Sequence, residues 1–175
     1  MTPGSNEGFR PIAALAAAAF PGAGHLVLGQ PMRALGAAAG VLLLFGGGLF
    51  IGGIDAIDSK EDRVWFYGQA LVGPITFGVD WAHQNHFKAI DTRTKQLRTG
   101  YPTETQTTDD TGQRVWRPLT ADEAAAGMGP PNVKGVGRMN ELGQLSCTLA
   151  GMMNLIIILD ALFPATRRRE SGGAS

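Results

Sequence analysis

The sequence lacks the residue patterns that mark most catalytic sites. Its single cysteine, Cys147, excludes a disulfide within the chain and any paired-cysteine metal motif. No His-Glu-x-x-His, Gly-x-Ser-x-Gly or phosphate-binding loop pattern occurs. The sequence therefore carries no signature of the common zinc, serine-nucleophile or nucleotide-binding sites. We therefore predict a protein that is not an enzyme and that holds no cofactor.

The chain also lacks an excess of charge of either sign. It has 15 basic and 15 acidic residues, and its formal net charge is +0. A chain without a basic surplus has no general attraction for a phosphate backbone, so we predict no nucleic-acid partner. Aromatic residues make up only 7% of the chain, whereas hydrophobic residues make up 44%. Small and aliphatic side chains therefore supply most of the apolar content.

These apolar side chains gather in long runs, although the mean hydropathy of the chain is near zero. Residues 34–54 carry no charge, and residues 142–163 carry only Asp160. As a helix, each run would be roughly 30 Å long, which is the thickness of a bilayer core. Two such runs are rare in a soluble protein of this size, so we predict an integral membrane protein.

Two further apolar stretches extend the predicted membrane region. Residues 11–28 could cross the bilayer, form a re-entrant segment, or be a signal peptide that is cut near Gly24. Residues 64–82 have aromatic side chains at both ends, as membrane-interface belts do, and Gly73-Pro74 predicts a kink or a break. The expected fold is an all-α integral membrane protein of the cell membrane, multi-pass, with three to four transmembrane helices and one long extramembrane loop.

The predicted spans divide the chain into five segments. They are a flexible N-terminus (1–9), a membrane hairpin plus third span (10–82), an extramembrane loop (83–139), a last transmembrane helix (140–163) and a basic flexible tail (164–175). Within the loop, the turn residues from Asp110 to Gly112 predict a short hairpin, and Thr120 with Glu123 predicts the capping box of a short helix. The loop has too few large apolar residues to fold as a stable domain by itself.

The segment PGAGHLVLGQPMRALG, residues 21–36, interrupts the most apolar third of the chain. Its glycines permit a tight turn between membrane helices, and Pro21 would stop or kink the first of them. His25 and Gln30 could bond to the carbonyl groups that such a turn exposes. Alternatively, His25 and Gln30 could form a polar pocket at membrane depth.

Asp80, His83 and His86 are candidate metal ligands. These residues would share one helix face, but the first and last would be about 9 Å apart along the axis. All three could bind one ion only if a turn unwound. Polar residues at a membrane interface explain the cluster more simply, so we predict no metal and retain these three as weak candidates.

The last apolar run carries a stripe of small residues that ends in an amide: Gly143, Cys147, Gly151 and Asn154. Such stripes allow two membrane helices to approach closely. We expect the stripe to face the bundle interior, with Gly36 and Gly40 as its matching surface. Asn154 should bond to a neighbouring helix, with Gln69 or the hairpin around His25 as the partner.

Two motifs resemble those of an uncharacterised family of small bacterial polytopic membrane proteins. The first, a paired-helix hairpin motif of the form PGxGHxxxGQ...RxxG, is matched by Pro21, Gly22, Gly24, His25, Gly29, Gln30, Arg33 and Gly36. The second, LGxxxxTxAGxxNxxxxxDA, is matched by Gly143, Thr148, Ala150, Gly151, Asn154, Asp160 and Ala161. Val27 replaces an aromatic residue that is frequent in the first motif. The resemblance implies a helical membrane protein and brings no activity.

These observations favour a non-enzymatic scaffold or an accessory subunit of a membrane assembly. Its partners would be the lipid bilayer and other membrane proteins or a second copy of the chain. One alternative is a permeation or transport component for small solutes or ions, suggested by polar residues in or near the predicted spans. The other alternative is a membrane-embedded metal-dependent enzyme that uses His25, His83 or His86.

Overall fold

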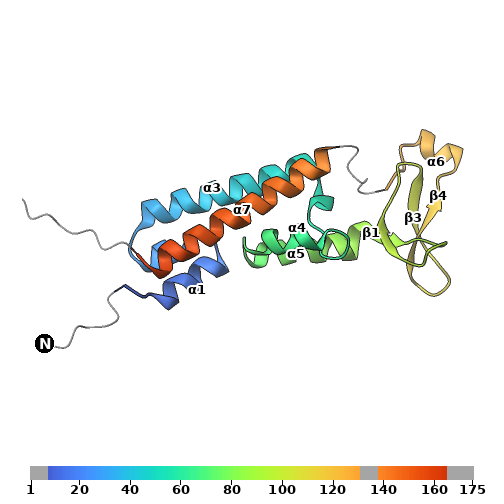
Figure 1. Cartoon of the computed structure of the whole chain (residues 1–175). Helices are drawn as coiled ribbons and strands as arrows, with labels where there is room; N and C mark the ends of the chain where they lie inside the picture. Colours follow the sequence, from blue (N-terminus) through green and yellow to red (C-terminus); the bar gives the residue numbers. More distant parts are fainter. Residues whose placement is uncertain (1–7, 131–137, 165–175) are drawn as a thin grey trace, which may run out of the picture.

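The computed structural model describes residues 8–130 and 138–164, so the predicted N-terminal segment and basic tail lie almost wholly outside it. Two long helices form its axis: α3 (Pro31–Gly52) and α7 (Arg138–Leu162). They lie side by side and run in opposite directions (Figure 1). Both helices are long and apolar enough to cross a membrane.

Glycines allow α3 and α7 to approach each other closely. A Cβ atom at Gly143 would lie 2.7 Å from the carbonyl oxygen of Gly48, and one at Gly48 would lie 2.6 Å from the Cys147 sulfur. The small-residue stripe of α7 therefore faces a neighbouring helix, where close backbone packing supplies the attraction. Gly36 and Gly40 do not form its matching surface. A Cβ atom at Gly36 would meet no described atom of another element within 4 Å, and one at Gly40 would lie 3.6 Å from the end of the Met153 side chain.

Two short helices precede α3: α1 (Pro11–Ala19) and α2 (Ala23–Val27). The start of α1 is fixed to the end of α7, because the Arg10 amide donates to the Leu162 carbonyl at 2.9 Å. After α1 the chain reverses at Pro21-Gly22, where Gly22 has a φ of 82°. α2 then runs back along α1, with Gly24 packed against Ala17.

A second set of short helices enters from the other end of the bundle: η1 (Ile54–Ala56), α4 (Arg63–Ala70) and α5 (Pro74–Ala82). α4 runs beside the first half of α7, where the Gln144 side chain donates to Asp62 at 2.5 Å. The predicted break at Gly73-Pro74 is confirmed, and the φ of Gly73 is 117°. A Cβ atom at Gly73 would lie 2.8 Å from the Ala18 carbonyl oxygen, so the ends of α1 and α4 meet.

Asn154 of α7 lies where these two helix ends meet. Its amide nitrogen donates to three backbone carbonyls, those of Ala17 (3.4 Å), Leu71 (2.9 Å) and Val72 (3.3 Å). Carbonyls at helix ends lack intrahelical partners, so one buried side chain satisfies groups from two helices. The expected partners, Gln69 and the turn around His25, are not the ones that the structure gives.

The Asn154→Leu variant should weaken the fold without abolishing it. Leucine has a similar size but cannot donate to the carbonyls, and an interhelical bond of this kind is worth about 0.6 to 2 kcal/mol. The thermal unfolding midpoint in mild detergent should fall. Met152→Leu, at a side chain of the same helix that is 54% exposed, is the matched control and should leave the midpoint unchanged. Equal midpoints for the two variants would contradict the role of Asn154.

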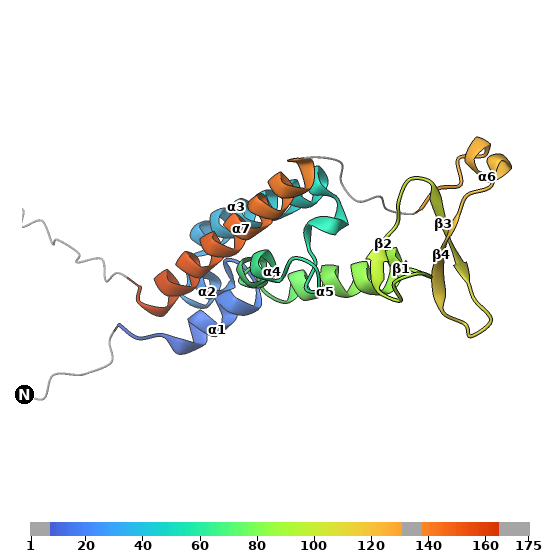
Figure 2. The ribbon, with the colours of Figure 1, turned by 45° about the vertical axis from the view of Figure 1, so that its right-hand side comes forward.

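Beyond the bundle the chain forms a small sheet of four strands: β1 (Lys88–Ile90), β2 (Leu97–Thr99), β3 (Glu104–Thr108) and β4 (Arg114–Pro118). The strand order is β2-β1-β4-β3; β1 and β4 are parallel, and the other pairs are antiparallel (Figure 2). The predicted turn at Gly112 connects β3 to β4. Helix α6 (Ala121–Ala125) begins with the predicted capping box of Thr120 and Glu123.

The prediction of an all-α protein with three to four transmembrane helices is therefore wrong. Among the described residues, only α3 and α7 are long and apolar enough to span a membrane. The longest of the other bundle helices, α1 and α5, have 9 residues each, about 14 Å, because each apolar stretch breaks at a Pro-Gly or Gly-Pro pair and turns back. The predicted extramembrane loop contains a sheet, because short strands with few apolar residues pair with one another across the segment.

Candidate functional site

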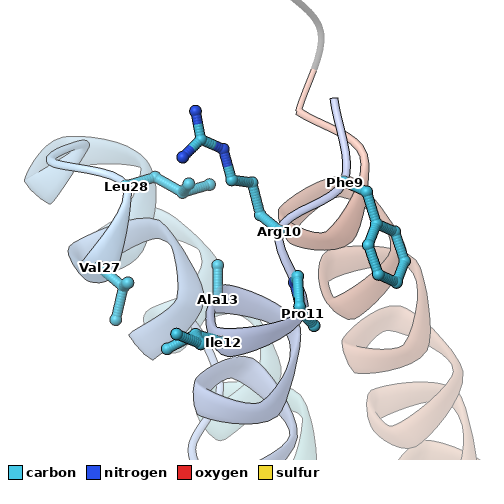
Figure 3. Close-up of a pocket in the computed structure, with 7 residues that line it drawn as sticks. All are labelled: Phe9, Arg10, Pro11, Ile12, Ala13, Val27 and Leu28. Atoms are coloured by element: carbon cyan, nitrogen blue, oxygen red, sulfur yellow. The ribbon is translucent and has the colours of Figure 1, made fainter. Parts of the chain in front are cut away.

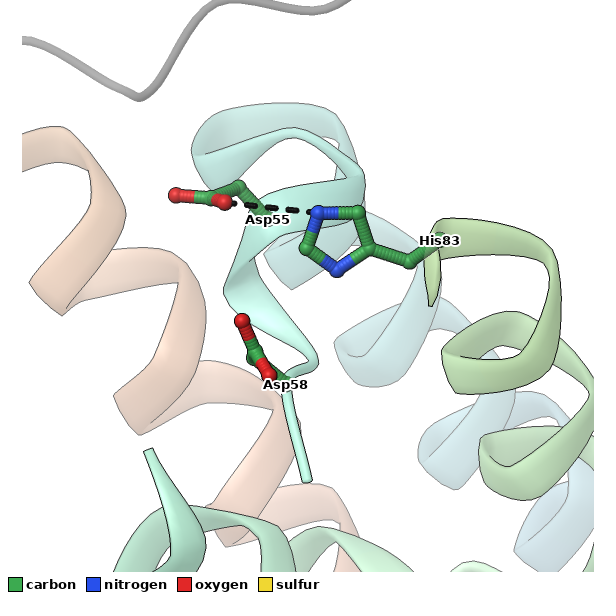
Figure 4. A group of neighbouring side chains, drawn as sticks. All are labelled: Asp55, Asp58 and His83. Carbon is green, nitrogen blue, oxygen red and sulfur yellow. Dashed lines mark ion pairs between the residues drawn. The ribbon is translucent and has the colours of Figure 1, made fainter. Parts of the chain in front are cut away.

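A cluster of buried ionisable side chains lies where the helical bundle meets the sheet. Asp55 lies in η1 and Asp58 shortly after it, and His83 begins η2 (His83–Phe87), the turn of π-helix that leads into β1 (Figure 4). All three residues are buried. Each offers one oxygen or nitrogen atom that could bind a metal, and these three atoms lie within 4.8 Å of one another. Among the described residues, this is the one group of three His, Cys, Asp or Glu side chains that is close enough to hold a metal ion.

The local backbone explains why these side chains meet. α3 ends at Gly53, whose φ of 72° suits glycine, and the chain turns across the end of the bundle. α5 returns to the same end, because α4 and α5 run in opposite directions. The extra residue in a π-helical turn rotates the side chains that follow it, and such turns are frequent at functional sites. His83 is fully buried in that turn.

His83 connects three elements through hydrogen bonds. Its Nδ1 lies 3.0 Å from the Ile57 carbonyl oxygen and must carry the hydrogen, since a carbonyl only accepts. Its Nε2 lies 3.4 Å from Oδ1 of Asp55 and 3.5 Å from the Thr99 hydroxyl. The Thr99 hydroxyl donates to Asp55 at 2.7 Å. These contacts join η1, η2 and β2, so they attach the sheet to the bundle.

Lys88, the first residue of β1, places a fully buried ammonium group beside Asp58 and 2.8 Å from Glu61. Burial alone would lower the pKa of Lys88, but the two carboxylates outweigh it and raise that pKa above 10.5. Burial alone would raise the pKa of Asp58, but hydrogen bonds from Lys88 and from the Glu61 and Lys60 amides lower it below 3.8. Both groups are therefore charged at neutral pH.

The donor set around Asp58 argues against a metal ion at this cluster. Its Oδ1 accepts hydrogen bonds from the Lys60 amide (2.9 Å), the Glu61 amide (3.1 Å) and the Gln84 side chain (2.9 Å). Its Oδ2 accepts from Lys88. A cation bound to Asp58 would have to displace the ammonium group, so Lys88 supplies the positive charge that a metal would otherwise bring.

The three weak metal candidates from the sequence do not converge. His83 belongs to the buried cluster. Asp80 accepts two hydrogen bonds from Ser59, at 2.9 Å from its amide and 2.6 Å from its hydroxyl. His86 is exposed and packs edge-on against Trp81, with ring centroids 5.4 Å apart.

Sequence reasoning missed Asp55, Asp58, Lys88 and Thr99. One signal was available for the two aspartates, because two carboxylates three residues apart directly follow an uncharged run. No comparable signal marks Lys88, since its partner Asp58 is 30 positions away and only the tertiary fold brings the two together.

The polar residues of the 21–36 segment have separate partners. His25 is buried, and its Nε2 lies 2.9 Å from the Asp160 carboxylate near the end of α7. Gln30 precedes α3, and its side-chain oxygen accepts from Arg33 at 3.2 Å. The segment therefore fixes α2 to α7. The side chains of His25 and Gln30 do not bond to each other, whereas the Gln30 amide donates to the His25 carbonyl at 2.8 Å. Gly29, with a φ of 70°, adopts the backbone conformation between α2 and α3 that favours glycine.

The fold and cluster define a class: a small protein with two long apolar helices that carries a sheet fixed to one end by buried ion pairs. The chain belongs to the family of unknown function DUF6677, whose profile matches residues 12–171. Comparison with curated proteins and with solved structures gave no match. The prediction that the chain belongs to an uncharacterised family is thus confirmed. Membership of this family assigns no activity to the protein.

Proposed function

We propose that this protein is a membrane-embedded scaffold that holds its sheet in a fixed position at the bilayer surface. The observation that carries this proposal is the exposure of the two long helices. In their most apolar windows, only 22% of the α3 residues and 28% of the α7 residues are buried within the protein. The core helix of a soluble protein would have most of this apolar surface covered.

The bundle leaves many large apolar side chains exposed, while it buries polar side chains beside its apolar core. Large apolar side chains point outward, among them Leu43 (76% exposed), Phe50 (91%) and Val64 (83%). The polar side chains of Gln69 and Asn154 are fully buried. Water would penalise so much exposed apolar surface by about 25 cal/mol per Å², whereas lipid does not.

The short helices can lie at membrane depth because the protein covers the backbone groups at their ends. Irregular backbone at membrane depth is tolerated where protein buries it. Val72 at the end of α4 is fully buried, and Asn154 donates to its carbonyl. The Thr76 hydroxyl donates to the Gln69 carbonyl at 2.8 Å, which satisfies another group at this break.

The two alternative functions have less support. A metal-dependent enzyme needs open ligand positions, but the ammonium group of Lys88 neutralises Asp58. A permeation pathway needs polar groups that line a wet passage, but Gln69 and Asn154 are buried and donate to backbone carbonyls of neighbouring helices. In a scaffold, the same polar groups have a structural use, since they fix the helices and the sheet relative to one another.

Membrane extraction tests the proposal directly. The full chain should stay with the membrane pellet in alkaline carbonate. Leu43→Lys, in the middle of α3, should shift the chain to the supernatant or to aggregates, because a charge there costs about 2.5 to 3.5 kcal/mol in a bilayer. Met128→Lys is the control, since Met128 is 55% exposed but lies outside the bundle. Recovery of the unmodified chain in the carbonate supernatant would refute a membrane-embedded scaffold.

A further inference from the structure

An apolar cleft opens at the end of the bundle opposite the sheet. It has a volume of about 310 Å³ and lies between the start of α1 and the end of α2 (Figure 3). Its lining residues are Phe9, Arg10, Pro11, Ile12, Ala13, Val27 and Leu28. All of them except Arg10 are apolar, so the cleft offers a hydrocarbon-like surface beneath one cationic side chain.

The position of the cleft follows from the packing of α1. The Arg10 amide donates to the Leu162 carbonyl, the last residue of α7, and so places Arg10 level with the end of a long helix. If α3 and α7 cross the bilayer, this level is the headgroup region on one side. Ile12 and Val27 then lie deeper, at the height of the acyl chains.

The Arg10 side chain is a cation with no counter-charge among the described residues. Across residues 8–130 and 138–164, its guanidinium group forms no ion pair or side-chain hydrogen bond. It extends over the cleft toward Leu28 in Figure 3. Asp160, the carboxylate near the end of α7, is bonded to His25 instead. The charge of Arg10 is thus available to a ligand.

We propose that this cleft binds one anionic phospholipid of the surrounding bilayer. The phosphate group contacts the Arg10 guanidinium, whose planar fork matches phosphate oxygens, and one acyl chain lies along Ile12, Val27 and Leu28. An anionic headgroup is favoured over a zwitterionic one, since choline already neutralises the phosphate of phosphatidylcholine. The proposal rests on the proposed function, because a lipid reaches the cleft only if the bundle is embedded in a membrane.

Lipid retention on the full chain tests the site. The protein, purified in mild detergent with equal amounts of phosphatidylglycerol and phosphatidylcholine, would be examined by native mass spectrometry. One phosphatidylglycerol should be retained in preference to phosphatidylcholine. Arg10→Gln should reduce that preference about fivefold, as expected for one basic side chain near an anionic surface. Its backbone amide, which bonds to Leu162, is unchanged.

Two further variants separate the cleft from general surface charge. Arg33→Gln removes a cation from the same end of the bundle but outside the cleft, and the preference should persist. Val27→Trp fills the apolar floor at a residue that is 56% exposed, and it should reduce the retention of both lipids.

Three outcomes would overturn the lipid site. They are equal retention of the two lipids by the unmodified protein, an equal loss of preference in Arg33→Gln and Arg10→Gln, and displacement of phosphatidylglycerol by millimolar inorganic phosphate. Each can occur in a protein that resists carbonate extraction, so failure of the lipid site is distinct from failure of the membrane scaffold.

Discussion

A single added methyl group in Gly151→Ala is expected to destabilise the bundle more than the loss of the Asn154 amide. A Cβ atom at Gly151 would overlap the carbonyl oxygen of Gly68 in α4 and would lie 3.0 Å from its carbonyl carbon. Backbone atoms cannot rotate away, so α4 and α7 must separate along their contact. Overpacking of this kind costs about 1 to 3 kcal/mol and sometimes more, and Gly151→Leu should be worse.

The sign of the effect distinguishes packing from helix propensity. Alanine in place of glycine normally stabilises a helix by up to about 1 kcal/mol. Gly46→Ala is the matched control, since a Cβ atom built there would meet no described atom of another element within 4 Å, and it should leave stability unchanged or raise it. The thermal unfolding midpoint in mild detergent is the measurement. If Gly151→Ala is as stable as Gly46→Ala, α4 and α7 do not pack as described.

Replacement of Lys88 by methionine should have the largest effect of any charged-residue substitution. Methionine has a similar length but leaves the buried Asp58 carboxylate without its counter-charge. Breaking one partner of a buried ion pair typically costs about 3 to 5 kcal/mol. Because Lys88 begins β1, we expect the sheet to detach from the bundle, which limited proteolysis would detect as cleavage within residues 88–118.

Two further variants test whether the loss of charge causes the destabilisation expected for Lys88→Met. Lys60→Met removes an exposed ammonium group from the loop that carries Asp58, and it should have little effect on stability. The double variant Lys88→Met with Asp58→Asn should recover part of the lost stability, because no buried charge is left unpaired. A double variant no more stable than Lys88→Met alone would mean that shape, and not charge, explains the loss.

The pH dependence of unfolding follows from the same pair. The pKa of Asp58 is lowered, so its contribution is present above its ordinary value of 3.8 and is lost as the pH falls through the folded-state pKa. The pKa of Lys88 is raised, so its contribution is present below 10.5 and is lost as the pH rises through the folded-state pKa. The stability of the unmodified protein should therefore fall at both extremes, and the double variant should respond less.

The features that the sequence predicted correctly are local ones. Length and lack of charge identified α3 and α7, and the run around Gly73-Pro74 identified a break. The capping box of Thr120 and Glu123 also depends on only four consecutive residues. Such features can be read from the chain because proline, glycine and capping side chains act on their immediate neighbours.

Where helices contact each other could not be read in the same way. Several glycines of α3 could have faced the stripe of α7, and periodicity does not choose among them. In the structure, Gly48 and Gly52 pack against the stripe instead of Gly36 and Gly40. The connection through η1 and the packing of α4 set the offset between α3 and α7 along their axes. The partners of Asn154 depend on the same offset, since they belong to the ends of α1 and α4.

By itself, the sequence determined that two long apolar helices form, where the shorter apolar stretches break, and how α6 begins. Only the tertiary structure decided that the broken stretches turn back as short helices, that four short strands form a sheet, and that Lys88 meets Asp58. The physical reason is distance along the chain. Parallel pairing of β1 with β4 and the burial of an ammonium beside a carboxylate 30 positions away become favourable only when the whole bundle brings these segments together.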